Sequence, residues 1–325
     1  MDGGIATATA GYQPAVLQSS GGVPVNAITI DVEDWYQLAH RKLLKSSVPA
    51  SQQVVVNTHR ILDLLAACHT RATFFVLGTI AAQFPELVVR IAREGHEVAT
   101  HGLVHRVVTG MSPKAFEADL LRSISILEDL AQQPILGHRA AEFSLNGTSQ
   151  WAFEIIAAAG LCYDSSIFPI RHPRYGMPAA PRHPYLVNTL NGTLVEFPLA
   201  TARVLGQNLP IAGGGYLRVF PVRFIRWGIR ELNRQGQMAV LYIHPYELAE
   251  EWLDLPVPTR TTRQWLNLRV RAVKRNLGRG QPVWAKLRAL LSAFPFVPLR
   301  EVIASEAQGQ DAVRFRTPCS TGEIY

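Results

Sequence analysis

Three acidic residues stand within four positions near the start of the chain, at Asp31, Glu33 and Asp34. The residues before them, 23–30, are rich in the β-branched side chains that favour a strand. Carboxylates are costly to bury unless a cation pairs with them, and a metal ion or an arginine is the usual partner. The pattern therefore predicts a first strand whose end carries a cation-binding acidic group.

Two histidines, His101 and His105, form the second group of residues that could do chemistry. Their spacing of four places both imidazoles on one face of a helical turn, close enough to share a cation. They follow a short strand-like run, 96–100, which should end beside Asp31. One carboxylate and two imidazoles leave a coordination position for water, which is typical of a catalytic zinc site. The alternative is a pair of surface or hydrogen-bonded histidines.

The segments that must position these residues alternate between helix and strand. Helices are predicted over 54–68, 80–94, 113–132, 149–159, 221–235 and 283–292. Strands are predicted over 71–77, 96–100, 135–139, 238–243 and 296–302, with a hairpin over 186–197 that turns at Asn191-Gly192. This alternation favours a parallel β/α architecture, closed or partly closed as a barrel, with its chemistry at the carboxyl ends of the strands.

Five short motifs occur in a fixed order along the chain, and together they resemble the polysaccharide deacetylases (carbohydrate esterase family 4, the NodB-homology fold). The motifs are Asp31-Val32-Glu33-Asp34, the His101/His105 pair, Gly137-His138-Arg139-Ala140-Ala141, Tyr163-Asp164-Ser165-Ser166 and Leu241-Tyr242-Ile243-His244. The resemblance covers about 28–247 and implies a distorted (β/α) barrel of parallel strands, to which this chain adds a C-terminal helical extension. Segments 31–35, 171–175 and 213–218 are similar to a branch found in exopolysaccharide loci of exosortase (PEP-CTERM) bacteria.

The resemblance also implies roles for four catalytic positions. Asp31 would be the base that assists a water already acidified by the metal. Arg139 would pair with Asp31 and orient it. His244 would be the general acid that protonates the leaving amine, and Asp164 would bond to its imidazole and raise its pKa.

Two carboxylates are candidates for the metal ligand, because Val32 stands where many members have a second aspartate. A related branch spaces its acids as Asp-x-Asp, which makes Glu33 the ligand with His101 and His105. Positions i and i+2 share one face of a strand, which favours Glu33, whereas Asp34 would serve if the strand has already turned. One divalent ion is expected, most readily zinc, although cobalt, nickel and iron accept the same ligands.

On the substrate side, Phe168 and Leu241 are expected to line the pocket for the acetyl methyl group. Tyr216 is expected to stack on the sugar, and Arg218 to contact an anionic group. Arg171 would line the same groove. The third motif departs from the family, because Ala141 replaces the usual proline and Glu142 adds a carboxylate, which predicts a looser loop beside the oxyanion.

The implied activity is metal-dependent hydrolysis of N-acetyl groups on an N-acetylhexosamine-containing glycan, an exopolysaccharide or its lipid-linked precursor. Two alternatives share the fold. An allantoinase-like or cyclic-imide hydrolase would have a compact, lidded pocket for a small ring. A non-catalytic glycan-binding module would bind sugar without metal-dependent turnover.

The 325-residue chain carries a net charge of +7. Much of this charge lies in 260–300, a segment that contains no acidic residue. This basic stretch predicts a solvated helical face, or a contact with an anionic glycan or a membrane surface. It lacks the interleaved aromatic residues that stack on bases, so nucleic acid is not an expected partner.

The domain organisation is predicted as a disordered leader over 1–22, a deacetylase-like barrel domain over 23–303 that includes the basic helical region 258–303, and a loose tail over 304–325. No signal peptide or apolar run of about eighteen residues is evident, so a cytoplasmic location is expected, with peripheral membrane contact as an addition. The three cysteines suggest no disulfide framework, and a reducing compartment fits them.

Overall fold

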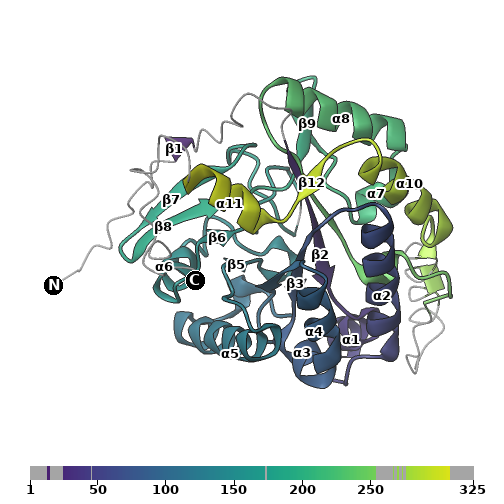
Figure 1. Cartoon of the computed structure of the whole chain (residues 1–325). Coiled ribbons are helices and arrows are strands. Elements are labelled where there is room, and N and C mark those ends of the chain that lie inside the picture. Colours follow the sequence, from purple (N-terminus) through teal and green to yellow (C-terminus); the bar gives the residue numbers. More distant parts are fainter. Residues whose placement is uncertain are drawn as a thin grey trace.

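The computed structural model describes residues 13–14, 25–44, 46–172, 174–253, 266, 269–270, 273 and 276–307. Its centre is a mostly parallel, curled sheet with helices packed around the outside (Figure 1). Six parallel strands run in the spatial order β6-β5-β4-β3-β2-β11, as the alternation of elements predicted. They are β2 (Asn26–Val32), β3 (Thr73–Val76), β4 (Glu97–Thr100), β5 (Gly137–His138), β6 (Tyr163–Asp164) and β11 (Val240–Ile243).

The predicted hairpin is present as β7 (Tyr185–Thr189) and β8 (Gly192–Glu196), and β8 extends the sheet beyond β6. A second hairpin, β9 (Thr201–Val204) and β10 (Gln207–Pro210), follows it. The backbone on either side of this hairpin lies along β11: Ala200 N donates to Val240 O at 3.1 Å, and Tyr242 N donates to Ala212 O at 2.7 Å. The chain from β8 to β11 therefore partly closes the barrel.

The long helices form where they were predicted, with one division. Pro85 splits the predicted helix 80–94 into α3 and α4, because proline has no N–H and clashes with the preceding turn. Ser112 caps α5 as expected, accepting a hydrogen bond from Ala115 N at 3.3 Å. The main helices are α2 (Gln52–Ala67), α3 (Gly78–Gln83), α4 (Pro85–Arg93), α5 (Pro113–Ala131), α6 (Trp151–Ala158), α8 (Val222–Arg234) and α10 (Gln281–Leu291). Short helices are α1 (Trp35–Ala39), a π-helical turn (His40–Leu44) and α7 (Gly215–Val219).

The strands are buried on both faces, which explains their continuous apolar character. Close packing inside the sheet depends on Gly137, because a Cβ at this position would lie 1.9 Å from the ring of Tyr163. The Tyr163 hydroxyl on β6 donates to Glu97 Oε1 on β4 at 2.9 Å, so a buried polar contact links these two strands across β5, which lies between them.

The prediction of a terminal strand over 296–302 is wrong. Only β12 (Phe296–Val297) is extended, pairing with the start of β2, and helix α11 (Leu299–Ala307) follows Pro298. Side chains of the sheet satisfy the first N–H groups of this helix: Leu299 N donates to Thr73 Oγ1 and Arg300 N to Glu97 Oε2, each at 2.9 Å. These acceptors stabilise a helix where the sequence alone indicated a strand.

Three further expectations concern segments that the structure describes only in part. Within the leader 1–22, Gln13–Pro14 form β1, which pairs with β7, and within the tail 304–325 the first residues belong to α11. Most of the basic stretch before 276 lies outside the described residues. The cysteines were expected to form no disulfide framework; Cys162 is disulfide-bonded, Cys68 is a free thiol, and Cys319 lies outside the described residues. None of the described helices is long and apolar enough to cross a membrane.

Candidate active site

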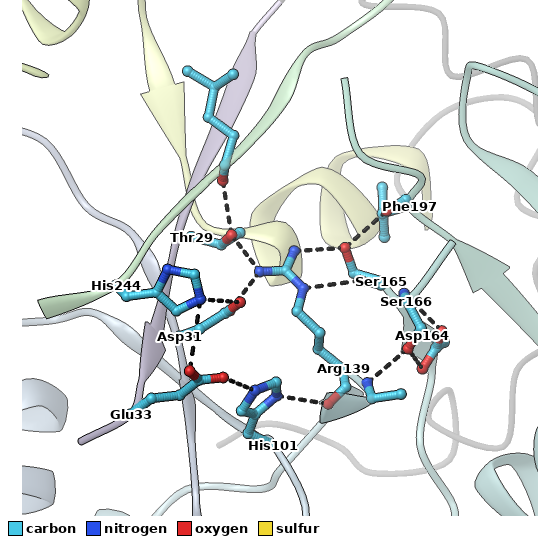
Figure 2. Close-up of polar contacts among 12 residues, drawn as sticks. Thr29, Asp31, Glu33, His101, Arg139, Asp164, Ser165, Ser166, Phe197 and His244 are labelled. Atoms are coloured by element: carbon cyan, nitrogen blue, oxygen red, sulfur yellow. Dashed lines mark hydrogen bonds and ion pairs between the residues drawn. The ribbon is translucent and has the colours of Figure 1, made fainter. Parts of the chain in front are cut away.

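The chemically active side chains gather at the carboxyl ends of the parallel strands (Figure 2). Thr29, Asp31 and Glu33 alternate along β2 and the residue after it, so their side chains share one face of the sheet. His101 follows β4 directly, Arg139 follows β5, Ser165 follows β6 and His244 follows β11. The parallel register brings these strand ends together, although their positions in the chain are far apart.

Glu33, His101 and His105 form a buried cluster whose ligand atoms all lie within 4.8 Å of one another. Glu33 Oε1 is 2.9 Å from His101 Nε2 and 2.8 Å from His105 Nε2. His101 Nδ1 lies 2.7 Å from the carbonyl oxygen of Arg139, which can only accept, so the ring proton resides on Nδ1. The other ring nitrogen, Nε2, faces the Glu33 carboxylate and is the atom of His101 that can bind a metal ion. One carboxylate and two imidazoles that converge in a buried site are a donor set that fits a divalent metal ion.

Asp34 is excluded as the metal carboxylate, because both of its oxygens are used elsewhere. Its Oδ2 accepts from Gln37 N at 2.9 Å and Ser51 N at 3.1 Å, and its Oδ1 accepts from Ser51 Oγ at 2.6 Å. Asp34 is thus the N-cap of α1 and the anchor of the chain before α2. The alternative ligand set that includes Asp34 is therefore wrong.

The expectation that His101 and His105 share a helical turn is also wrong. The segment that holds them is a loop, in which Gly102 has a φ of +83° that interrupts any helix. Gly102 N donates to Thr100 Oγ1 at 3.1 Å, which fixes the turn after β4. The two imidazoles converge through this loop geometry.

Asp31 and Arg139 form a fully buried ion pair, as the resemblance implied. Arg139 Nη1 donates to Asp31 Oδ1 at 2.7 Å and to Thr29 Oγ1 at 2.6 Å. Its other donors reach Ser165, with Nε on the carbonyl oxygen at 2.8 Å and Nη2 on Oγ at 2.7 Å. The guanidinium also lies 4.1 Å from the ring centre of Phe75. The carboxylate is consequently held at one oxygen, while Asp31 itself lines the cavity beside the metal cluster.

His244 also lines this cavity and lies close to both acids. Its Nε2 lies 3.7 Å from Glu33 Oε2 and 4.0 Å from Asp31 Oδ2, and its Nδ1 lies 3.3 Å from Glu247 Oε2. Burial favours the neutral imidazole, yet Glu33, Glu247 and Asp31 outweigh it and raise the pKa of His244. In the opposite direction, burial works to raise the pKa of Glu33, but His105, His244 and His101 hold it well below its usual value.

The expected contact between Asp164 and His244 is wrong. Asp164 Oδ1 lies 2.6 Å from His138 Nδ1, and both its oxygens accept from Ser166, at 2.9 Å from N and 2.9 Å from Oγ. Three strands separate its strand, β6, from β2, and β11 lies beyond β2. Ser166 Oγ in turn accepts from Ala140 N at 2.7 Å, so Asp164 supports the loop after Arg139 (Figure 2).

Glu247 occupies the position beside His244 that was expected for Asp164. It is buried and contacts the imidazole from three residues further along the chain. Its backbone and side chain complete a reciprocal cap with His244. The spacing His-x-x-Glu was a signal in the sequence that could have identified this residue.

A cavity of about 270 Å³ opens above the cluster and contains several predicted substrate residues. Tyr216 and Arg218 line it as expected, but Arg218 Nε lies 3.5 Å from Glu247 Oε1, so its charge is directed at that carboxylate. Glu142 of the third motif also lines it, with a φ of 56°, and Lys42 Nζ lies 3.0 Å from its Oε1. The extra carboxylate is thus compensated by a neighbouring cation.

Two predicted pocket residues lie elsewhere. Leu241 borders a small apolar cavity with Leu287 and Leu290 of α10, and its neighbour Tyr242 lines the site cavity. Phe168 is only 1% exposed and packs edge-to-face against Phe143. Neither Leu241 nor Phe168 lines the 270 Å³ cavity, so both predictions are wrong. Arg171 lines an adjacent cavity rather than this one.

Comparisons with known proteins agree with this fold. Residues 49–158 match the family model described as polysaccharide deacetylase, and 165–304 match a domain of unknown function, DUF3473. The chain therefore carries a polysaccharide deacetylase domain of the NodB-like, carbohydrate esterase 4 class.

Among curated relatives, the chain is similar to a chitooligosaccharide deacetylase of Bradyrhizobium sp., with 30% identity over 102 residues, which are 31% of this chain and 44% of that protein. It is also similar to the peptidoglycan deacetylase of Helicobacter pylori, with 30% identity over 212 residues, 61% of this chain and 64% of that protein. The chain thus spans less than two thirds of the length of these relatives.

Two solved structures share the fold over nearly the whole chain. A putative polysaccharide deacetylase from Mycobacterium smegmatis superposes with a TM-score of 0.59 at 22% identity, covering 92% of this chain and 96% of that one. The Puue allantoinase gives a TM-score of 0.59 at 14% identity, covering 92% and 95%. At these identities the likeness concerns the fold alone, and it confirms the predicted (β/α) barrel.

Proposed function

We propose that this protein hydrolyses N-acetyl groups of an N-acetylhexosamine-containing glycan, with a divalent metal ion held by Glu33, His101 and His105. The observation that carries the proposal is the convergence of these three ligand atoms beside the buried Asp31–Arg139 pair. The names of the relatives, chitooligosaccharide deacetylase and peptidoglycan deacetylase, support the same class of substrate.

The reaction breaks the amide C–N bond, forms a C–O bond from water, and yields acetate and a free amine. A bound metal ion would supply Lewis acidity to the acetyl carbonyl and to the attacking water. Asp31 accepts the proton of that water, and Arg139 keeps the carboxylate in place through its bond to Oδ1. His244, which lines the same cavity, donates a proton to the leaving nitrogen. Glu247 and Tyr246 hold the imidazole in position, the latter by stacking at 4.8 Å between ring centres.

The shape of the site favours a glycan over a small cyclic imide. The 270 Å³ cavity shares Tyr216 with a second cavity of about 580 Å³. It also shares Glu33 and Tyr246 with a third of about 260 Å³, which Trp35 and Trp252 line. The metal cluster therefore lies where cavities meet, which suits an extended substrate with sugars on more than one side.

Within this class we propose an exopolysaccharide or its lipid-linked precursor as the substrate, zinc as the metal and the cytoplasm as the location. The similarity of segments 31–35, 171–175 and 213–218 to the exosortase-associated branch motivates the substrate. Metal analysis of the purified protein and fractionation of producing cells test the other two statements.

The central test is acetate release from a panel of N-acetylated oligosaccharides, measured before and after removal of metal with a chelator. We expect turnover that the chelator abolishes and added metal restores. Asp31→Asn and His101→Ala should abolish it, whereas the matched control Asp129→Asn, at an exposed position on α5, should retain it. Normal acetate release by either site variant, or turnover of cyclic imides alone, would overturn the proposal.

A further inference from the structure

The cavity of about 580 Å³ beside the catalytic cavity has no role in the chemistry described so far. It lies between the β9–β10 hairpin, the loop after β6, and helix α7. The lining residues that bear on its ligand are Arg171, Arg203, Gln207, Asn208, Tyr216 and Phe220. Because Tyr216 lines both cavities, a ligand in one would extend directly into the other.

The charge of this cavity is positive. Arg171 and Arg203 are its two charged lining residues, both are exposed, and no acidic residue lines it. In the part of the chain that the structure describes, neither guanidinium forms an ion pair. The excess of positive charge also affects the neighbouring Arg182: burial, and then the charge of Arg203, lower the pKa of its guanidinium. A pair of arginines without acidic partners favours an anionic ligand.

The remaining walls of the cavity suit a sugar. Phe220 stacks on Tyr216 with 6.3 Å between ring centres and 14° between planes, which makes an aromatic wall leading from the metal cluster. Aromatic faces of this kind pack against the apolar side of a flat ligand, while polar groups set its orientation. Gln207 and Asn208 supply amide groups, and Asn208 Nδ2 is already held by Pro169 O at 2.7 Å. An anionic group attached to a sugar ring satisfies both the charge and the walls.

We propose that the substrate is an acidic glycan, in which a sugar carboxylate binds at Arg171 and Arg203 while a neighbouring N-acetylhexosamine occupies the metal cluster. This inference rests on the proposed function and narrows its substrate. Carboxylate matches the planar, bidentate donor pattern of arginine. The uronic acid and the acetamido sugar would belong to one chain that passes over Tyr216.

The test compares two probes that differ only in charge. One is an oligosaccharide that alternates N-acetylglucosamine with glucuronic acid, and the other is the same oligosaccharide with its carboxyl groups reduced to alcohols. We expect the metal-loaded enzyme to release acetate from the acidic probe with a kcat/KM at least about tenfold higher, because a charge-assisted hydrogen bond contributes about that factor or more. The preference should decrease with added salt.

Arg171→Gln and Arg203→Gln should each reduce the ratio of kcat/KM between the two probes, and the double variant should bring it close to one. Arg223→Gln, at an exposed arginine of α8 that lies outside the cavity, is the matched control and should keep the wild-type ratio. Thermal unfolding of each variant checks that the fold is intact.

The two proposals fail in different ways. Equal turnover of both probes, or a preference for the acidic probe that survives the double variant, would overturn the acidic-glycan inference and leave deacetylation standing. If neither probe is turned over, calorimetric binding decides: tighter binding of the acidic probe that depends on Arg171 and Arg203 supports the arginine cavity, and equal binding overturns it. The absence of turnover would then count against the proposed function alone.

Discussion

Arg139 donates to Oδ1 of Asp31 at 2.7 Å, and Asp31 Oδ2 lies 4.0 Å from the imidazole of His244. One oxygen of the carboxylate is thus fixed by a buried cation, while the carboxylate still borders the cavity in which the reaction would occur. An arginine with four hydrogen bonds to Asp31, Thr29 and Ser165 is a rigid support, so Asp31 needs no rearrangement before it accepts a proton.

The first prediction concerns the stability of this pair. Arg139→Met keeps most of the side-chain volume but leaves Asp31 buried without its cation, so we expect the free energy of unfolding to fall by about 3 to 5 kcal/mol. Urea unfolding of the metal-free protein, followed by tryptophan fluorescence, measures this change.

The double variant Arg139→Met with Asp31→Asn provides the control. Removing the stranded charge should restore part of the lost stability, which gives a favourable coupling energy in the double-mutant cycle. Strictly additive losses would show that the two residues do not stabilise the fold as a pair.

The second prediction separates Glu33 from Asp34 as the metal carboxylate. Glu33→Gln should reduce bound metal strongly, since it removes the anionic oxygen that lies between His101 and His105. Asp34→Asn should bind metal as the wild type does and lose about 1 kcal/mol of stability through its weakened cap. Metal content by elemental analysis, together with thermal unfolding, distinguishes the two; the reverse pattern would place the ligand at Asp34.

The third prediction concerns metal removal. Because the three ligand atoms converge only in the folded chain, binding of the ion should stabilise the native state. We expect the unfolding temperature to rise with zinc concentration. At a free zinc concentration of a hundred times Kd, the free energy of unfolding should increase by about 2.7 kcal/mol. His105→Ala should remove this dependence, and a similar response to zinc in that variant would contradict the assigned cluster.

The fourth prediction assigns the support of His244 to Glu247 and not to Asp164. Glu247→Gln should lower kcat for acetate release by about tenfold or more, as is common for residues that orient a catalytic group, with KM changed little. Asp164→Asn should act mainly on stability, because its partners are His138 and Ser166. A loss of kcat in Asp164→Asn without a change in unfolding temperature would reverse this assignment.

The fifth prediction follows from His96, which is 2% exposed and accepts a hydrogen bond from Ala72 N at Nδ1 over 3.2 Å. Burial, with help from Arg300, Arg71 and Arg90 and against Glu94, lowers its pKa from 6.5 to about 4. Between pH 6.5 and pH 4, His96 is therefore protonated in the unfolded chain but largely neutral in the native state. Stability should fall over this range as the pH decreases, by about 2 to 3 kcal/mol at pH 4.5 relative to pH 7.

His96→Asn tests this statement, because asparagine offers an acceptor oxygen near the position of Nδ1 but does not titrate. The variant should lose that part of the pH dependence in urea unfolding curves at pH 7 and 4.5. His69→Asn, at an exposed histidine whose φ of 48° asparagine tolerates, is the control and should keep the wild-type dependence. An unchanged slope in His96→Asn would contradict the prediction.

Much of the architecture was predictable because local patterns carry it. Strand β3 is a short run of buried β-favouring residues, and α5 begins at a serine cap, so both appear where the sequence indicated. Glu33 was predictable as a site residue because side chains two apart share one face of a strand. The parallel order of strands then brings Asp31, His101 and His244 to one edge.

Other features depend on contacts between distant segments, which no local pattern reveals. The role of Asp34 depends on Ser51, which lies 17 residues further along the chain. Asp164 was assigned from its motif, but the strand order places His138, and not His244, beside it. Leu241 was assigned to the pocket although the pleat turns the next residue, Tyr242, toward it.

Helix α11 covers the end of the barrel opposite the candidate active site, and this affects how the protein can be shortened. Thr73 and Glu97 of the sheet hold its first turn, and Arg300 Nη2 donates to Gly95 O at 2.9 Å. Deleting the chain from position 298 onward would uncover the amino-terminal ends of β3 and β4 and leave the Glu97 carboxyl group short of a donor. Shortened versions intended for crystallisation or secretion should accordingly keep this helix, because a chain cut before it would expose strand ends that promote aggregation.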